Sequence, residues 1–233
     1  MGFVNLKIVG TSHIAPESKK RIIGAFNEFG PDIICVELDA NRLAGLKKGG
    51  SRRVGLSAIR DVGVIGYLFA SIGGYIQKKL GNITGMSPGD EMLLASSLAE
   101  DNGLRLELID RDVRFTLKKI SKIPLKERFR IVWDFISAPF KRGQRVKINI
   151  GKIPEEGFVK KLTAQLKDRY PYIYRVVIDE RNKFMAKKIF LLMRDNPDKR
   201  ILVVVGEGHV EGIKDYLKKL EQDNVSFISY SSA

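Results

Sequence analysis

The chain contains two histidines, His13 and His209, and each stands three residues after a glycine that closes an apolar stretch. The two segments read Gly10-Thr11-Ser12-His13 and Gly206-Glu207-Gly208-His209. A third apolar stretch is followed directly by Glu37. Two imidazoles and one carboxylate are a sufficient ligand set for a catalytic divalent metal ion with open coordination positions. Such an ion would acidify a bound water molecule and polarise a carbonyl group.

The same three residues also suit a reaction without metal. Glu37 would then act as general base on a water molecule, while His13 and His209 hold that water or the substrate. The sequence leaves both mechanisms open, and both predict a hydrolase. A lone histidine at the start of a helix more often caps the helix or packs in the core. Two histidines in the same position, with a carboxylate at a third strand end, favour a functional site.

Two arginines are further candidates for this site. Arg111 follows the apolar stretch 104–109, and Arg181 lies inside a long helical pattern. An arginine near a hydrolytic centre stabilises developing oxyanion charge or binds a substrate carboxylate. The competing interpretation of each arginine is a structural salt bridge with a nearby acid such as Asp110 or Glu180.

Strands and helices alternate at both ends of the chain, and this arrangement predicts where the candidate residues lie. A strand–helix–strand unit places its strands in parallel, and ligands bind beyond the carboxyl ends of such strands. The apolar runs predict strands at 4–9, 33–38, 104–109, 201–205 and 225–230, and the 3.6-residue spacing predicts helices at 16–29, 90–101 and 210–220.

The middle of the chain shows almost only helical patterns. Residues 112–194 include predicted helices at 125–140, 155–170 and 173–194. The expectation is therefore a single α/β domain over residues 1–233. It has a mainly parallel sheet with flanking helices, and the long helical insertion 112–194 caps the strand ends.

The single cysteine, the N-terminal sequence and the length of the apolar stretches indicate the cellular compartment. Cys35 is the single cysteine, which excludes an internal disulfide and fits a reducing compartment, with the thiol buried in a strand. The N-terminus lacks the pattern of a signal peptide. The most apolar stretch, 62–76, has about 15 residues, fewer than the roughly 20 that a spanning helix needs. We therefore expect the chain in the cytoplasm or on the cytoplasmic side of a membrane.

The chain carries a net charge of +14. Nucleic acid, anionic lipid and acidic substrates are the partner classes that such a charge suits, and the competing interpretation is a solvated lysine-rich surface. The densest basic cluster, 141–147, has no aromatic residues that could stack on bases, so nucleic acid is not expected. Association with a membrane surface stays open, as does a homodimer through the glycine-containing stretch 62–76.

Six ordered segments of the chain resemble the motifs of the TraB family, which includes pheromone-shutdown proteins and is related to Tiki metalloproteases and erythromycin-esterase-like enzymes. The segments are Gly10-Thr11-Ser12-His13 with Ser18, Val36-Glu37-Leu38-Asp39 with Arg42, Pro88-Gly89-Asp90-Glu91-Met92 with Ala95, Asp110-Arg111-Asp112 with Thr116, Glu180-Arg181 with Met185-Ala186, and Val205-Gly206-Glu207-Gly208-His209-Val210.

The resemblance implies a metal-dependent hydrolase acting on a peptide, with a divalent ion of unspecified identity. Its core catalytic and metal-binding residues would be His13, Glu37 and His209. The residues lining the pocket and binding substrate would be Arg42, Glu91, Arg111, Glu180 and Arg181. Two residues depart from the family pattern: Ser12 stands where alanine is usual, and Glu207 replaces a small residue. Family members often continue into a C-terminal hydrophobic region, so we expect this chain to be a domain cut from a membrane-tethered protein.

The alternative to an enzyme is a protein that binds and sequesters a peptide or a lipid-linked partner in the same cleft. Its basic surface would then dock it to anionic lipid at the membrane.

Overall fold

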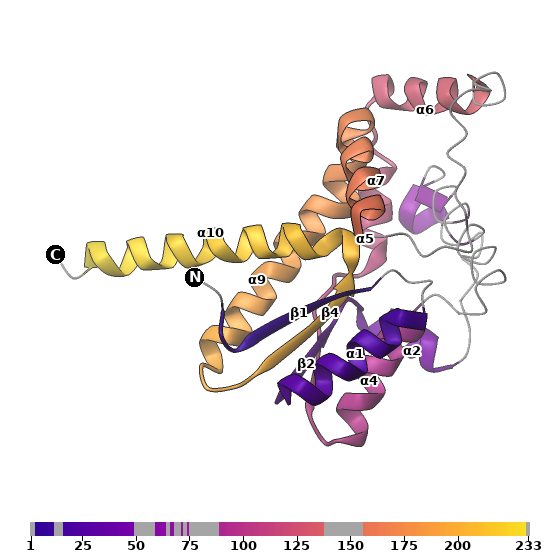
Figure 1. Cartoon of the computed structure of the whole chain (residues 1–233). Helices are drawn as coiled ribbons and strands as arrows, with labels where there is room; N and C mark the ends of the chain where they lie inside the picture. The colour runs from indigo at the N-terminus through magenta and orange to yellow at the C-terminus, as the bar shows by residue number, and fades with distance from the viewer. Residues whose placement is uncertain are drawn as a thin grey trace.

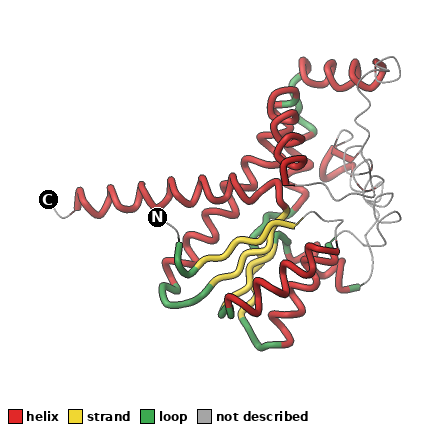
Figure 2. Tube along the Cα trace, in the orientation of Figure 1, coloured by secondary structure: helices red, strands yellow, loops and turns green. Residues whose placement is uncertain are grey.

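A sheet of parallel strands organises the part of the chain that the computed structural model describes, namely residues 3–11, 16–48, 59–63, 66–67, 71, 74, 89–137 and 156–231. Within these residues the sheet has four strands in the order β1-β4-β2-β3, and every pair is parallel. Figures 1 and 2 show the sheet between layers of helices. The strands are β1 (Leu6–Thr11), β2 (Ile33–Val36), β3 (Arg105–Leu108) and β4 (Ile201–Gly206).

The two inner strands are apolar along their whole length because helices cover both of their faces. Every residue of β4 and β2 is buried, and such continuous apolar runs are typical of parallel strands inside a sheet. The edge strands β1 and β3 keep half-buried positions. The predicted parallel α/β sheet is confirmed.

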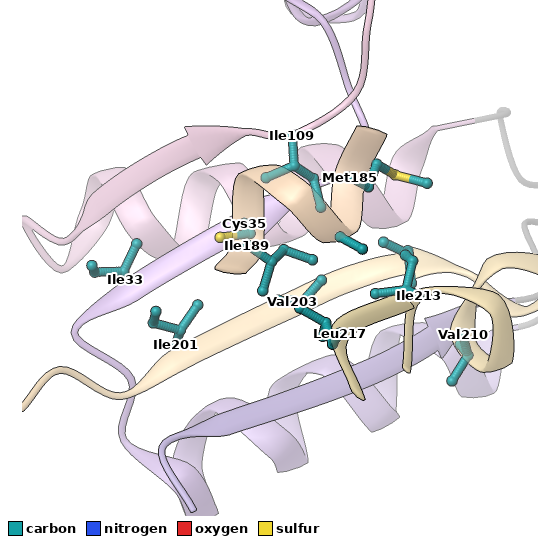
Figure 3. Close-up of a cluster of buried hydrophobic side chains, with 12 residues drawn as sticks. Ile33, Cys35, Ile109, Met185, Ile189, Ile201, Val203, Val210, Ile213 and Leu217 are labelled. Carbon is teal, nitrogen blue, oxygen red and sulfur yellow. The ribbon is translucent and has the colours of Figure 1, made fainter. Parts of the chain in front are cut away.

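One face of the sheet is covered by α1 (Pro16–Phe29) and α4 (Asp90–Asp101), which pack on alternate strand residues such as Ile34 and Val204. The opposite face is covered by α9 (Glu180–Asp195) and α10 (Glu207–Ser231). Figure 3 shows this second core, in which Ile189 and Leu217 meet Val203. The candidate residues Glu37, Arg181 and His209 therefore lie on or directly after elements anchored by two apolar cores.

The predicted helical region follows β3 directly and extends from the carboxyl-end side of the sheet (Figure 1). Its helices in chain order are α5 (Val113–Ile120), α6 (Leu125–Ser137), α7 (Glu156–Arg169), α8 (Pro171–Tyr174), the π-helical turn η1 (Arg175–Asp179) and α9. The predicted helix 173–194 is therefore helical throughout but contains a π-helical segment. The short helix α2 (Ala40–Lys47) follows β2.

The predicted fifth strand at 225–230 is wrong, because α10 continues to Ser231. Valine, phenylalanine, isoleucine and tyrosine in this segment favour a strand by propensity. No proline or glycine follows Gly212 before Ser231 to end the helix, and extending an existing helix by one residue costs far less than starting a new element.

Some features noted in the sequence lie among the described residues, and others lie outside them. Cys35 is buried as expected, and burial raises the pKa of its thiol. Among the helices described, none combines the length and the apolar character needed to cross a bilayer. The apolar stretch 62–76 lies largely outside the described residues, and the basic cluster 141–147 lies wholly outside them.

Candidate active site

Glu37 lies at the carboxyl end of β2, where its backbone continues the pairing with β4. Its N–H donates to the Val204 carbonyl at 3.1 Å. Its carboxylate turns toward the end of β4, where Oε2 accepts from the backbone N–H of Gly206 at 2.7 Å. The other oxygen, Oε1, lies 3.3 Å from His209 Nε2, and both side chains are only 6% exposed. Two of the three predicted core residues therefore meet in a buried position.

His209 lies in the first turn of α10, and its two ring nitrogens have different partners. Nδ1 lies 2.6 Å from Asn182 Oδ1 on α9. Nε2 lies 3.1 Å from Nη1 of Arg181. A guanidinium group can only donate hydrogen bonds, so Nε2 carries the lone pair and Nδ1 carries the proton that the Asn182 oxygen accepts. The lone pair of His209 therefore faces Glu37 and Arg181.

Arg181 joins two buried carboxylates. Its guanidinium donates to Glu37 Oε1, and to Asp110 through Nη2 at 2.6 Å and through Nε at 3.2 Å. Burial opposes the positive charge of Arg181, but the neighbouring carboxylates of Glu37 and Asp110 outweigh that effect and raise its pKa. Arg181 is therefore a permanent cation held between two acids.

The π-helical turn η1 contacts both arginines of this region through its carbonyl groups. In a π-helix the carbonyl groups are displaced from the α-helical pattern, and two of them accept bonds from arginine side chains. Arg181 Nη1 donates to the Val177 carbonyl, and Arg111 Nη2 donates to the Val176 carbonyl, both at 3.3 Å. Such turns are frequent at functional sites.

Arg111 and Glu180 form a second ion pair beside the first, at 3.3 Å. Lys119 on α5 also donates to Glu180, at 2.6 Å. Burial opposes the charge of Glu180, but the hydrogen bonds from Lys119 and Arg111 lower its pKa overall. Each arginine therefore forms a salt bridge with one of the two acids considered in the sequence, Arg181 with Asp110 and Arg111 with Glu180.

The remaining predicted residues have different positions. Arg42 on α2 lies with Nη1 3.7 Å from Asp110 Oδ2, and its side chain is 39% exposed. Glu91 is fully buried in the first turn of α4, which packs on the other face of the sheet from α9 and α10. His13 lies outside the described residues. Thr11, two residues before it in the sequence, pairs with Gly206 beside the start of α10.

The glycines of the two histidine segments belong to the strands themselves. Gly10 and Gly206 lie inside β1 and β4, and neither has the positive φ angle of a tight turn. A Cβ atom on Gly10 would lie 2.0 Å from Glu207 Oε2. The same Cβ atom would lie 2.9 Å from Cγ2 of Val210, so Gly10 leaves room beside β1 for Val210 and for the carboxylate of Glu207.

Two residues of the site were not among the predicted site residues. Asp110 holds Arg181 and lies near Arg42, and its position after an apolar strand was an available signal. Asn182 is 2% exposed and binds His209. A Cβ atom on Gly212 would lie 2.0 Å from Asn182 Nδ2. This dependence of Asn182 on a glycine 30 residues later is a property of helix packing that the sequence pattern does not reveal.

Among the described residues, no group of three His, Cys, Asp or Glu side chains is placed to hold a metal ion. Glu37 Oε1 and His209 Nε2 have the separation of two metal ligands, and in this structure the guanidinium of Arg181 contacts both atoms. Two ligands of one tetrahedral zinc ion, each at about 2.0–2.2 Å from it, lie roughly 3.3–3.6 Å apart, and the observed separation is 3.3 Å. The hydrogen bond from Nδ1 to an amide oxygen is the usual support of a metal-binding histidine. The described residues supply these two donors, and the third predicted ligand, His13, is outside them.

Comparison with known proteins places the chain in a family. The model of the TraB/PrgY/gumN family matches residues 4–227. An uncharacterized protein of Methanocaldococcus jannaschii is 34% identical over 225 residues, covering 94% of this chain and 55% of that protein. TraB domain-containing proteins of Homo sapiens and Bos taurus are each 24% identical, covering 89% of this chain and 61% of theirs. The chain thus spans somewhat more than half the length of these relatives. With a match over almost all of its residues, the chain belongs to the TraB/PrgY/gumN family.

Proposed function

We propose that this chain is a metal-dependent hydrolase that cleaves a peptide, with Glu37 and His209 at the reaction centre and His13 as a third metal ligand. The observation that carries the proposal is the buried convergence of Glu37 Oε1 and His209 Nε2 at 3.3 Å. It lies at the carboxyl edge of a parallel sheet, the edge at which such folds bind their ligands.

The chain's own residues prepare this point for chemistry. Asn182 holds the ring of His209 with its Nε2 lone pair toward the site, and the Gly206 N–H holds the carboxylate of Glu37. A divalent ion bound there would acidify a water molecule and polarise the substrate carbonyl. Glu37 and His209 would hold that ion.

The charges around the centre favour a cation and an anionic or polar substrate group. Glu37 and Asp110 contribute two buried carboxylates, and Arg181 is the buried guanidinium between them. Arg42 lies on the solvent side of Asp110 and is the more exposed of the two arginines that contact it. We infer that Arg42 binds a substrate carboxylate or the developing oxyanion, while Arg111 and Glu180 line the pocket.

A metal-independent hydrolase is the second candidate, because Arg181 already places a positive charge on Glu37. In that mechanism Glu37 is the general base on water and His209 holds the water. Elemental analysis of the purified chain and of the variant H13A/H209A separates the two. Metal in the wild type that is lost in the variant supports the first mechanism, and a metal-free wild type that still hydrolyses peptides supports the second.

The direct test is hydrolysis of a peptide library followed by mass spectrometry. We expect cleavage by the wild type and strongly reduced cleavage by H13A, H209A and E37Q. The matched control is E107Q, because Glu107 on β3 is a partly exposed glutamate paired with Arg105. If the wild type cleaves no peptide, or if the histidine variants cleave as fast as the wild type, the proposal is wrong. Peptide binding that survives E37Q without cleavage would identify a sequestering protein instead.

A further inference from the structure

The helix α6 carries its apolar side chains on the outside of the molecule. Five of its residues are large, apolar and 55 to 73% exposed, namely Leu125, Phe129, Val132, Trp133 and Ile136. Their spacing of four, three, one and three residues places them along one face of the helix. Figure 1 shows α6 at the end of the helical region that lies farthest from the sheet. We call this set of five side chains the α6 apolar face.

The opposite side of α6 faces the protein, where Ile131 packs against a buried apolar cluster and two acidic residues form hydrogen bonds. Glu127 is 6% exposed and accepts from the backbone N–H groups of Tyr172 and Ile173 at 3.1 Å, where α8 begins. Asp134 accepts from the side chains of Arg169 and Tyr170. These contacts hold α6 to the segment of α7 and α8 and leave its five exposed apolar residues outside.

The rim of the α6 apolar face is basic. Lys126 and Arg130 are exposed and adjoin it on the helical wheel, and exposed Lys122 precedes the helix. Because the two acidic residues of α6 face inward, its described outer surface combines aromatic and aliphatic side chains with positive charge. This composition matches that of helices that lie in the interface of an anionic bilayer, with the apolar face among the acyl chains and the basic rim near the headgroups.

We propose that α6 docks this chain on the surface of an anionic lipid membrane through the α6 apolar face. Charge favours this occupant over a second copy of the chain, since each copy carries +14 and the two basic rims would repel one another. The proposal concerns a surface remote from Glu37 and His209, and it holds or fails independently of hydrolase activity.

Trp133 is the only tryptophan in the chain, so its fluorescence reports directly on the α6 apolar face. The full chain is mixed with phosphatidylcholine vesicles that do or do not contain phosphatidylglycerol. With phosphatidylglycerol present, we expect the emission to shift to shorter wavelength and the protein to sediment with the vesicles. Added salt should weaken this binding because it screens the basic rim.

The variant F129Q/I136Q should reduce vesicle partitioning by at least about tenfold, because two large side chains no longer enter the acyl region. K126E should weaken binding to vesicles that contain phosphatidylglycerol and should leave binding to pure phosphatidylcholine vesicles unchanged. The control V4Q changes an 89% exposed valine next to β1, outside α6, and should bind like the wild type. Circular dichroism checks that all variants are folded.

Three results would overturn the proposal. The first is no binding to vesicles that contain phosphatidylglycerol. The second is binding that F129Q/I136Q leaves unchanged. The third is a shift of the Trp133 emission without lipid as protein concentration rises, accompanied by dimerisation in sedimentation that F129Q/I136Q abolishes, which would assign the face to a second copy.

Discussion

Asn182 Oδ1 lies 2.6 Å from His209 Nδ1, and this bond between α9 and α10 determines which nitrogen of the imidazole faces the candidate site. Replacement of Asn182 by leucine removes the acceptor and leaves a buried N–H without a partner. We expect the unfolding free energy to fall by about 1–3 kcal/mol and metal affinity or hydrolysis to fall about 10- to 100-fold.

The nitrogen chemical shifts of the imidazoles separate positioning from simple destabilisation. Because the chain has only two histidines, the ring signals can be assigned with one histidine variant. The wild type should show His209 protonated at Nδ1, whereas N182L should show a mixture of tautomers. An unchanged tautomer in N182L together with unchanged hydrolysis would mean that Asn182 does not orient the ring.

Gly212 and Gly208 offer a matched pair of substitutions on the same helix. An alanine Cβ at Gly212 would lie 2.0 Å from Asn182 Nδ2, whereas at Gly208 the nearest atom would be 3.7 Å away. G212A must displace Asn182, and we expect a loss of about 1–3 kcal/mol in unfolding free energy. G208A should change it by no more than about 1 kcal/mol, because alanine favours the helix. Urea denaturation measures both, and equal effects would contradict the packing described.

Arg181 and Arg42 both lie near Asp110 but differ in burial, with side chains 14% and 39% exposed. R181M leaves Glu37 and Asp110 buried without their guanidinium, which should cost about 3–5 kcal/mol of unfolding free energy. R42M removes a longer and more exposed contact and should cost less than about 1 kcal/mol. Chemical denaturation of the two variants tests this order, which would be refuted if R42M were the more damaging.

Tyr216 on α10 provides a prediction of pH dependence. Burial and the hydrogen bond that its hydroxyl donates to Asp179 at 3.0 Å raise the pKa of Tyr216 to about 12. The folded state therefore retains a proton that the unfolded state releases near pH 10. Its contribution to stability is complete below about pH 10 and is lost as the pH rises from about 10 to 12.

The difference in tyrosinate absorbance between the wild type and Y216F isolates this group during an alkaline titration. The wild type should show an additional ionisation near pH 12 that Y216F lacks. In Y216F the stability should depend less steeply on pH across this interval. An additional ionisation at the pH of free tyrosine would show that Asp179 does not bind the hydroxyl.

The sequence predicted helix boundaries well where a proline begins a helix or a glycine follows its end. The helix 16–29 begins at Pro16 and ends before Gly30, which has a φ angle of 54°. The helix 90–101 ends shortly before Gly103, with a φ angle of 63°. Prediction failed at 225–230, where apolar composition suggested a strand and no terminator separates the segment from α10.

The sequence predicted those residues of the candidate site that directly follow strands. Glu37 and His209 follow β2 and β4, and parallel strands bring these ends to one edge. Asn182 was not predictable, because its partner depends on how α9 packs against α10. Arg181 was predicted as a candidate site residue, with a structural salt bridge as the alternative. The structure shows that these two interpretations coincide, because Arg181 pairs with Asp110 and also with Glu37.

The most direct test of the central claim is a double-mutant cycle on kcat/KM for a peptide that the chain cleaves. E37Q and H209Q should each lower kcat/KM by at least about 100-fold. Because the two side chains would act on the same water or ion, the double variant should be no slower than the slower single variant. Losses that multiply in the double variant, or a single variant as active as the wild type, would contradict one shared centre at Glu37 and His209.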